Sequence, residues 1–313
     1  MTPFLIRRLL TGALLSSALA TASTLAVIPA LAADPVRVGS KIDAEGGLLG
    51  NMMIHVLEAN GIKTVNKLQM GATKIVRGAL VAGEIDLYPE YTGNAGFFFS
   101  VDSDPAWKNA AKAYAKAAEL DAANNIIWLK PAPANNTWAI ALRKDLAEAS
   151  KLASMEDLGK FIASGGTFKL AASAEFVESP AALPTFQSAY GFKLASNQTL
   201  VLAGGDTSAT IRAAAEKTSG VNAAMVYGTD GAIAALGLVV MTDTKGAQAI
   251  YEPAPTIRKA VLEANPKIRE LLEPVFASLD ATTLQGLNAK VQVEGIDSKK
   301  VALDYLKAKG FVK

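Results

Sequence analysis

The sequence predicts an α/β protein with two lobes joined by two extended crossovers. Short β-like runs alternate with helical patterns, which is typical of βαβ units and a largely parallel sheet. Residues 131–136, rich in proline and asparagine, interrupt this alternation and form the first predicted crossover. A second α/β set follows, and residues 228–231 form the predicted return. Two lobes joined in this way make a hinged clamshell, a shape suited to closing around a small ligand.

The first lobe begins with two strand-helix units. The apolar residues of its first helix share one face at i, i+4, i+7 and i+8: Leu49, Met53, Val56 and Leu57. The predicted elements of this lobe are strands at 36–40, 64–69 and 126–129, helices at 48–59 and 73–82, and a surface helix at 106–120. We assign residues 34–136 to this part of the first lobe.

The second lobe is predicted to span residues 137–228. Its expected elements are an extended stretch at 137–142, an α/β run at 158–172, helices at 181–190 and 208–217, and a strand at 223–227. Residues 229–313 are expected to return to the first lobe as a mostly helical tail. The helices predicted there are 256–264, 268–278, 282–291 and 298–309.

Residues 1–33 have the features of a cleavable signal peptide. Arg7 and Arg8 give a positive n-region, an apolar stretch follows, and Ala-Leu-Ala at 30–32 supplies the small residues of a cleavage site. We expect the mature chain to start at residue 33 or 34. The chain has no cysteine, so this terminus cannot carry the lipid of a bacterial lipoprotein. The sequence therefore predicts export to the periplasm without lipidation.

The composition argues against several other classes. A single histidine, His55, and no cysteine leave few ligands for a zinc or iron site and little basis for a Ser-His-Asp triad. The chain has 31 basic and 29 acidic residues, and removal of Arg7 and Arg8 makes the two numbers equal. A basic surface for nucleic acid is therefore not expected. We predict a monomer that is not an enzyme and that uses no metal and no cofactor.

Ordered motifs along the predicted mature chain point to one family. They are Val-Gly-Ser-Lys at 38–41, Asp-Leu-Tyr-Pro-Glu-Tyr-Thr-Gly-Asn at 86–94, Pro-Ala-Asn-Asn-Thr-Trp at 133–138, Ala-Ala-Ser-Ala-Glu-Phe at 171–176, Leu-Ala-Gly-Gly-Asp at 202–206 and Val-Tyr-Gly-Thr-Asp-Gly at 226–231. In these motifs the chain resembles the osmoprotectant-binding components of ABC importers for glycine betaine, choline and carnitine. It looks most like the OsmF/YehZ-type branch.

The resemblance implies a type II periplasmic-binding-protein fold, an aromatic cage for the ligand, and an inner-membrane ABC permease as partner. A quaternary ammonium has no N–H to donate, so aromatic rings suit it, and each cation–π contact contributes ~0.5–2 kcal/mol. Carried over from the family's motifs, the cage rings fall on Tyr91, Trp138 and Tyr227. The family's lysine, a partner for a ligand carboxylate, falls on Lys41, and a polar residue of the site falls on Asn94.

The chain departs from the family's pattern at two places. Ser179 stands where the family commonly has an arginine that binds the ligand carboxylate, and residues 202–206 lack a tyrosine that many betaine binders have. With Lys41 as the evident carboxylate partner, we expect either weak binding of glycine betaine or a different ligand. Asp206 would suit a bare cation such as choline, with Asn94 as a further polar partner.

Two other functions fit the same residues. The fold could bind an amino acid or another amine. A secreted enzyme, which is a different class, would need a carboxylate pair, and Glu175 with Glu178 is the best-placed one. Outside their motifs, the tyrosines could cap strands through their hydroxyl groups, Trp138 could be core, and Lys41 could be a solvated surface residue. The motif context favours binding.

Overall fold

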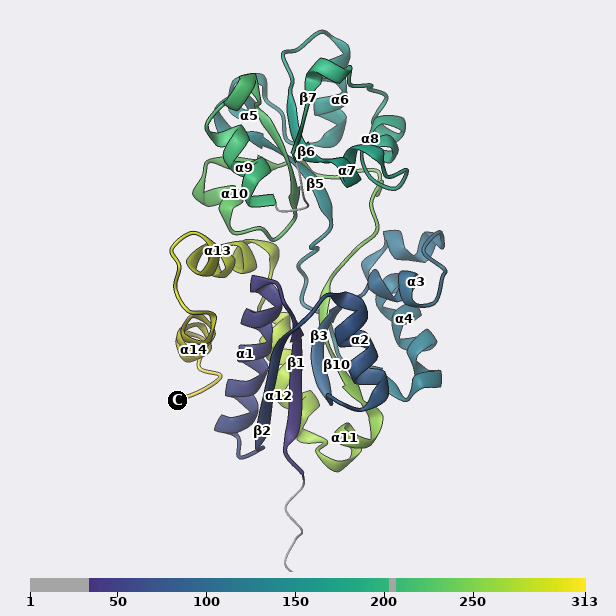
Figure 1. Cartoon of the computed structure of the whole chain (residues 1–313), viewed down its shortest axis with the longest axis vertical. Coiled ribbons are helices and arrows are strands. Elements are labelled where there is room, and N and C mark those ends of the chain that lie inside the picture. The colour runs from purple at the N-terminus through teal and green to yellow at the C-terminus, as the bar shows by residue number, and fades with distance from the viewer. Residues whose placement is uncertain (1–33, 203–206) are drawn as a thin grey trace, which may run out of the picture. The chain divides into compact units, whose positions relative to one another are not determined.

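The computed structural model describes residues 34–202 and 207–313, which belong to one compact unit (Figure 1). The predicted signal peptide and Asp206 lie outside the described residues. Two five-stranded sheets form the centres of two lobes, so the predicted two-lobe α/β architecture is confirmed. Within 34–202 and 207–313, no helix has the length and apolar character needed to cross a membrane.

The sheet of the first lobe has the strand order β2-β1-β3-β10-β4. Its strands are β1 (Val36–Lys41), β2 (Thr64–Gly71), β3 (Leu87–Tyr91), β4 (Ile126–Trp128) and β10 (Pro253–Arg258). Strands β1, β2 and β3 are parallel, whereas β10 runs antiparallel to β3 and β4. Because the carboxyl ends of parallel strands meet at one edge of a sheet, Lys41 and Tyr91 emerge side by side there.

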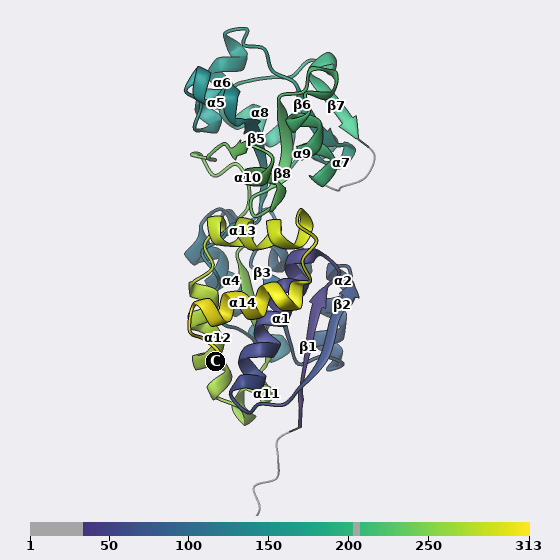
Figure 2. The ribbon, with the colours of Figure 1, turned by 90° about the vertical axis from the view of Figure 1, so that its left-hand side faces the viewer.

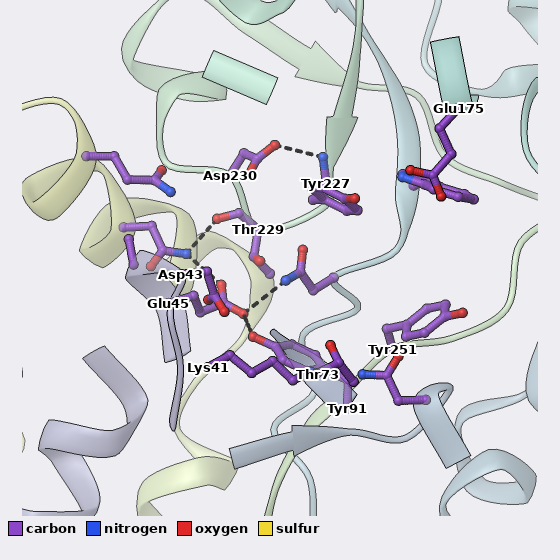
Figure 3. Close-up of a pocket in the computed structure, with 16 residues that line it drawn as sticks. Lys41, Asp43, Glu45, Thr73, Tyr91, Glu175, Tyr227, Thr229, Asp230 and Tyr251 are labelled. Atoms are coloured by element: carbon purple, nitrogen blue, oxygen red, sulfur yellow. Dashed lines mark hydrogen bonds between the residues drawn. The ribbon is translucent and has the colours of Figure 1, made fainter. Parts of the chain in front are cut away.

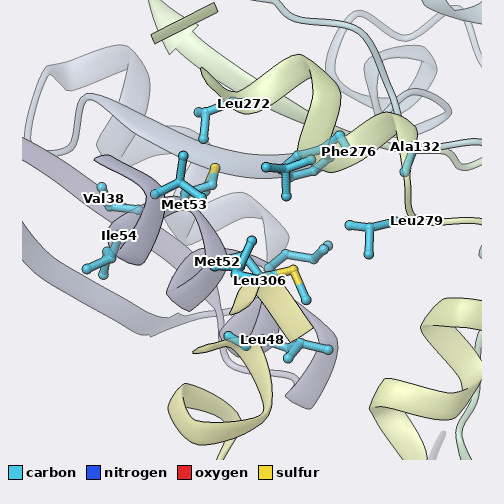
Figure 4. Packing of buried hydrophobic residues seen from close by; sticks show 14 of the residues in the cluster. Val38, Leu48, Met52, Met53, Ile54, Ala132, Leu272, Phe276, Leu279 and Leu306 are labelled. Carbon is cyan, nitrogen blue, oxygen red and sulfur yellow. The ribbon is translucent and has the colours of Figure 1, made fainter. Parts of the chain in front are cut away.

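Helix α1 anchors the core of the first lobe. Asp43 caps it by accepting a hydrogen bond from the backbone N–H of Gly46, so the helix begins at residue 44, earlier than predicted. Its apolar side chains pack against β1 and the C-terminal helices α12 and α14 (Figure 4). The helices of this lobe are α1 (Ala44–Ala59), α2 (Thr73–Ala82), α3 (Asn94–Phe98), α4 (Ala110–Asp121), α11 (Lys259–Ala264), α12 (Lys267–Ala277), α13 (Ala281–Gln292) and α14 (Ser298–Ala308).

The sheet of the second lobe has the order β7-β6-β8-β5-β9. Its strands are β5 (Trp138–Arg143), β6 (Leu170–Ser173), β7 (Thr199–Leu202), β8 (Ala223–Tyr227) and β9 (Leu238–Val240). Its helices are α5 (Lys144–Ser150), α6 (Met155–Ala163), α7 (Ala174–Glu178), α8 (Leu183–Tyr190), α9 (Thr207–Ala215) and α10 (Ala232–Ala235). Strands β5 and β8 pair antiparallel, and the register sets Trp138 opposite Tyr227.

The return to the first lobe lies later in the chain than the sequence predicts. Residues after 231 still belong to the second lobe, because β9 pairs with β5. The segment that leads back to the first sheet, which we call the second crossover, therefore runs from 241 to 252 and enters β10.

The prediction of a helix starting at residue 256 is also wrong for its first three residues. Residues 253–258 form the strand β10, and the helix α11 begins only at Lys259. The two prolines of β10 cannot donate a backbone hydrogen bond. Their carbonyl oxygens accept instead, Pro253 from the N–H of Ala132 and Pro255 from the N–H of Leu129.

Candidate functional site

A cavity of about 510 Å³ lies between the two lobes, a volume typical of small-molecule sites. Five of the six residues singled out from the sequence line it: Lys41, Tyr91, Asn94, Trp138 and Tyr227. The sixth, Asp206, is outside the described residues. The lining comes from both sheets, both crossovers and α13 (Figure 3). The chain thus brings residues that are far apart in sequence to one site.

Trp138 and Tyr227 form one aromatic wall on the side of the second lobe. They are cross-strand neighbours, and their rings lie nearly parallel, with centroids 6.5 Å apart and an interplanar angle of 21°. Phe176 of α7 meets the Trp138 ring edge-on, with centroids 6.0 Å apart. Because cross-strand neighbours share one face of a sheet, the two rings lie on the same side of the pocket and form one aromatic surface. They do not lie on opposite sides of a ligand.

Tyr91 and Tyr251 face this wall from the other side of the pocket (Figure 3). Tyr91 ends β3, and its side chain is almost fully buried. Tyr251 lies on the second crossover, where its backbone N–H donates to Oδ1 of Asn135 over 2.8 Å. Gly93 makes room for the Tyr251 ring, since a Cβ at Gly93 would lie 2.7 Å from the Cε1 atom of that ring. The described residues therefore contribute four aromatic rings to the pocket.

Lys41 is already paired inside the protein. Its Nζ atom lies 2.6 Å from Oε1 of Glu90, a fully buried carboxylate, and 4.5 Å from the centroid of the Tyr91 ring. Asn94 donates its amide to the same Glu90 oxygen over 2.7 Å, and the Tyr88 hydroxyl donates to the other oxygen. Two of the predicted ligand residues, Lys41 and Asn94, thus each donate a hydrogen bond to Glu90.

Glu45 is a second buried carboxylate on the pocket wall. Its Oε1 atom accepts from the Tyr91 hydroxyl over 2.6 Å and from the Asn136 amide over 3.2 Å. Its Oε2 atom accepts from the amide of Asn288 over 2.6 Å. Burial raises the pKa of Glu45, whereas hydrogen bonds, first among them the one from Thr229, lower it, and the net direction is upward.

The lining of the pocket is predominantly acidic. Lys41 is its one cationic side chain among residues 34–202 and 207–313, whereas the carboxylates are Asp43, Glu45, Glu175 and Asp230. The described part of the chain contains no cluster of three or more side chains suited to holding a metal ion. Rings flanked by carboxylates provide the chemistry that attracts an organic cation.

Comparison with known proteins identifies the family. The model of the OpuAC family, the substrate-binding domain of ABC-type glycine betaine transport systems, matches residues 34–308. The chain belongs to this family. The glycine betaine-binding protein YehZ of Escherichia coli is 61% identical over 287 residues, which cover 91% of this chain and 94% of YehZ. A glycine-betaine-binding protein of Pseudomonas aeruginosa is 30% identical over 281 residues, or 88% of each chain.

A solved structure supports the same assignment. Apo YehZ from E. coli matches with a TM-score of 0.84 and 61% identity, covering 90% of this chain and 100% of that one. The predicted resemblance and the two-lobe binding-protein fold are both confirmed. OpuAC proteins are binding components of transport systems and not an enzyme family. Of the two glutamates considered as a carboxylate pair, Glu175 lines the pocket in the described part of the chain and Glu178 does not.

Sequence reasoning missed several residues of this OpuAC pocket. Tyr251 was not predicted because the return crossover was placed at 228–231, about twenty positions before this residue. Tyr251 lies two positions before β10, much as Trp138 directly follows the first crossover, and this parallel could have revealed it. Glu45 and Asn288 are 243 positions apart and carry no local motif that indicates their contact.

Proposed function

We propose that this chain captures a small quaternary-ammonium osmolyte of the glycine betaine or choline type and delivers it to an inner-membrane ABC permease. The observation that carries the proposal is the convergence of Tyr91, Trp138, Tyr227 and Tyr251 on one cavity between the lobes. Rings drawn from both lobes and from a crossover would enclose a trimethylammonium group when the lobes approach each other. The relatives that bear the name glycine betaine-binding protein support the same ligand class.

The charges of the pocket favour a cation without a carboxylate. Lys41 is held by Glu90, so a ligand carboxylate would have to compete for it. The four rings of the pocket act alike on the quaternary ammonium group of choline and of glycine betaine, so the charged side chains decide between the two ligands. We therefore propose that choline binds more tightly than glycine betaine, whose carboxylate also meets the acidic lining of the pocket.

The cellular setting completes the proposal. We propose that residues 1–33 are a cleavable signal peptide, that the chain is not lipidated, and that it acts in the periplasm as a monomer without catalysis. The family match begins at residue 34, directly after the predicted cleavage region, which supports this division. We place the boundary between the first lobe and the second at residues 136 and 137 and the return on the second crossover.

A thermal-shift screen tests the ligand class. Choline, glycine betaine, carnitine, proline betaine and free amino acids are added to the purified protein and to Tyr91→Ala. A ligand that binds only the native state stabilises it by about 2.7 kcal/mol at 100 times its dissociation constant. We expect quaternary amines to raise the melting temperature of the wild type and to have a smaller effect on Tyr91→Ala. A wild type that responds to none of them, or to amino acids alone, contradicts the proposed ligand class.

A further inference from the structure

One face of α13 holds the loop that follows β8 of the second lobe. Gln285, Asn288 and Gln292 recur at i, i+3 and i+7 and so share that face. Gln285 donates to the carbonyl oxygen of Gly228 over 2.8 Å, Asn288 donates to that of Thr229 over 2.8 Å, and Gln292 accepts from the N–H of Gly231 over 3.1 Å. Figure 2 shows α13 next to α10, with which it is in contact.

Asn288 differs from the other two because it also reaches the ligand pocket. Its amide nitrogen donates both to Thr229 and to Oε2 of Glu45, and the other oxygen of Glu45 accepts from the Tyr91 hydroxyl. A chain of hydrogen bonds therefore runs from Tyr91 through Glu45 and Asn288 to Thr229. Thr229 lies two positions after Tyr227, so these hydrogen bonds connect Tyr91 with the Tyr227 side of the pocket.

The three side chains in this series of hydrogen bonds are buried, which makes their geometry specific. Asn288 is 1% exposed, Glu45 is 5% exposed and Tyr91 is 6% exposed. Both N–H groups of the Asn288 amide are directed at acceptors, and its Oδ1 atom has no partner within residues 34–202 and 207–313. A buried polar group with an unmet acceptor costs stability, whereas its satisfied bonds hold their partners firmly.

We infer that Asn288 is a positioning residue of the ligand site, which acts through Glu45 and Thr229 to fix the Tyr91 ring relative to the Tyr227 wall. The inference rests on the proposed function, because it assumes that the ligand lies between these rings. Asn288 acts on the ligand by setting the distance between two rings, and Glu45 transmits its effect to Tyr91. A helix near the C-terminus thereby controls the shape of a cage whose rings come from elsewhere.

The test compares Asn288→Leu with Gln285→Leu in the full protein. Asn288→Leu removes both donated hydrogen bonds at similar side-chain volume. Gln285→Leu is the matched control, since it also loses a bond to the loop, from the same helix face, but does not contact Glu45. Asn288→Ser, which keeps one donor, replaces Asn288→Leu if the latter does not fold.

The first readout needs no ligand. The seven tyrosines are replaced by 3-fluorotyrosine, and Tyr91→Phe identifies the ¹⁹F resonance of Tyr91 by its disappearance. We expect Asn288→Leu to shift this resonance and Gln285→Leu to leave it in place. An unchanged Tyr91 resonance in Asn288→Leu, with or without a lower melting temperature, would overturn the inference by showing that the residue is merely structural.

The second readout is the dissociation constant for choline and for glycine betaine, measured by calorimetry. We expect Asn288→Leu to raise it about 10-fold and Gln285→Leu by less than about 3-fold. In the Tyr91→Phe background, Asn288→Leu should add no further loss, because the hydroxyl through which it acts is gone. Additive losses would contradict the inference. If neither compound binds the wild type, the proposed function fails, and the fluorine comparison still decides the role of Asn288.

Discussion

Trp138→Leu is expected to weaken the binding of choline by about 10- to 30-fold. The Trp138 ring forms the larger part of the aromatic surface, and a desolvated cation–π contact contributes up to about 2 kcal/mol, which corresponds to roughly 30-fold in affinity. Leucine keeps an apolar side chain next to Phe176 but offers no aromatic face to a cation. Calorimetric titration with choline measures the effect.

Two variants control for indirect effects of this substitution. Tyr227→Phe keeps the neighbouring ring and should retain affinity within about 3-fold. Phe97→Ala removes a ring that is 52% exposed and lies outside the pocket lining, so it should leave affinity unchanged. An equal loss in Trp138→Leu and Phe97→Ala, or no loss in Trp138→Leu, would show that the aromatic surface does not hold the ligand.

Lys41→Met is expected to lower the free energy of unfolding by about 3–5 kcal/mol. The substitution leaves Glu90 as a fully buried carboxylate without its cation, and breaking one side of a buried ion pair has a cost of this size. The remaining hydrogen bonds from Tyr88 and Asn94 offset only part of it. Urea denaturation at neutral pH measures the change.

The double variant Lys41→Met with Glu90→Gln is the control for this prediction. Removing both charges eliminates the unpaired buried carboxylate, so most of the lost stability should return. If Lys41→Met alone is as stable as the wild type, Lys41 is not committed to Glu90. Lys41 would then be available to a ligand carboxylate, and glycine betaine would be expected to bind more tightly than choline.

The fold and the aromatic residues of the site could be predicted because their signals are local. Alternating strand and helix patterns indicated both lobes, and short motifs pointed to Tyr91, Trp138 and Tyr227. Each of these rings stands at the end of a strand, where a short motif and a backbone position coincide. Their presence around one cavity follows from the sheet topology.

The partners of the charged residues could not be predicted, since they depend on tertiary contacts. Lys41 is 49 positions from Glu90, and the sequence offered it only as a ligand partner or a surface lysine. The last three residues of β10, 256–258, were predicted as helix because the antiparallel neighbours of this strand lie far away in the chain. Tyr251 was missed because the return to the first lobe was predicted too early, and it adds a ring to the pocket lining.

The most direct test of the account is a calorimetric comparison of choline with 3,3-dimethyl-1-butanol, its neutral isostere. The two molecules share shape and hydroxyl group and differ in the positive charge. We predict that choline binds and that the isostere binds at least about 30-fold more weakly, because the rings and carboxylates of the pocket recognise the charge. Equal affinity for the two compounds, or no binding of choline, would contradict it.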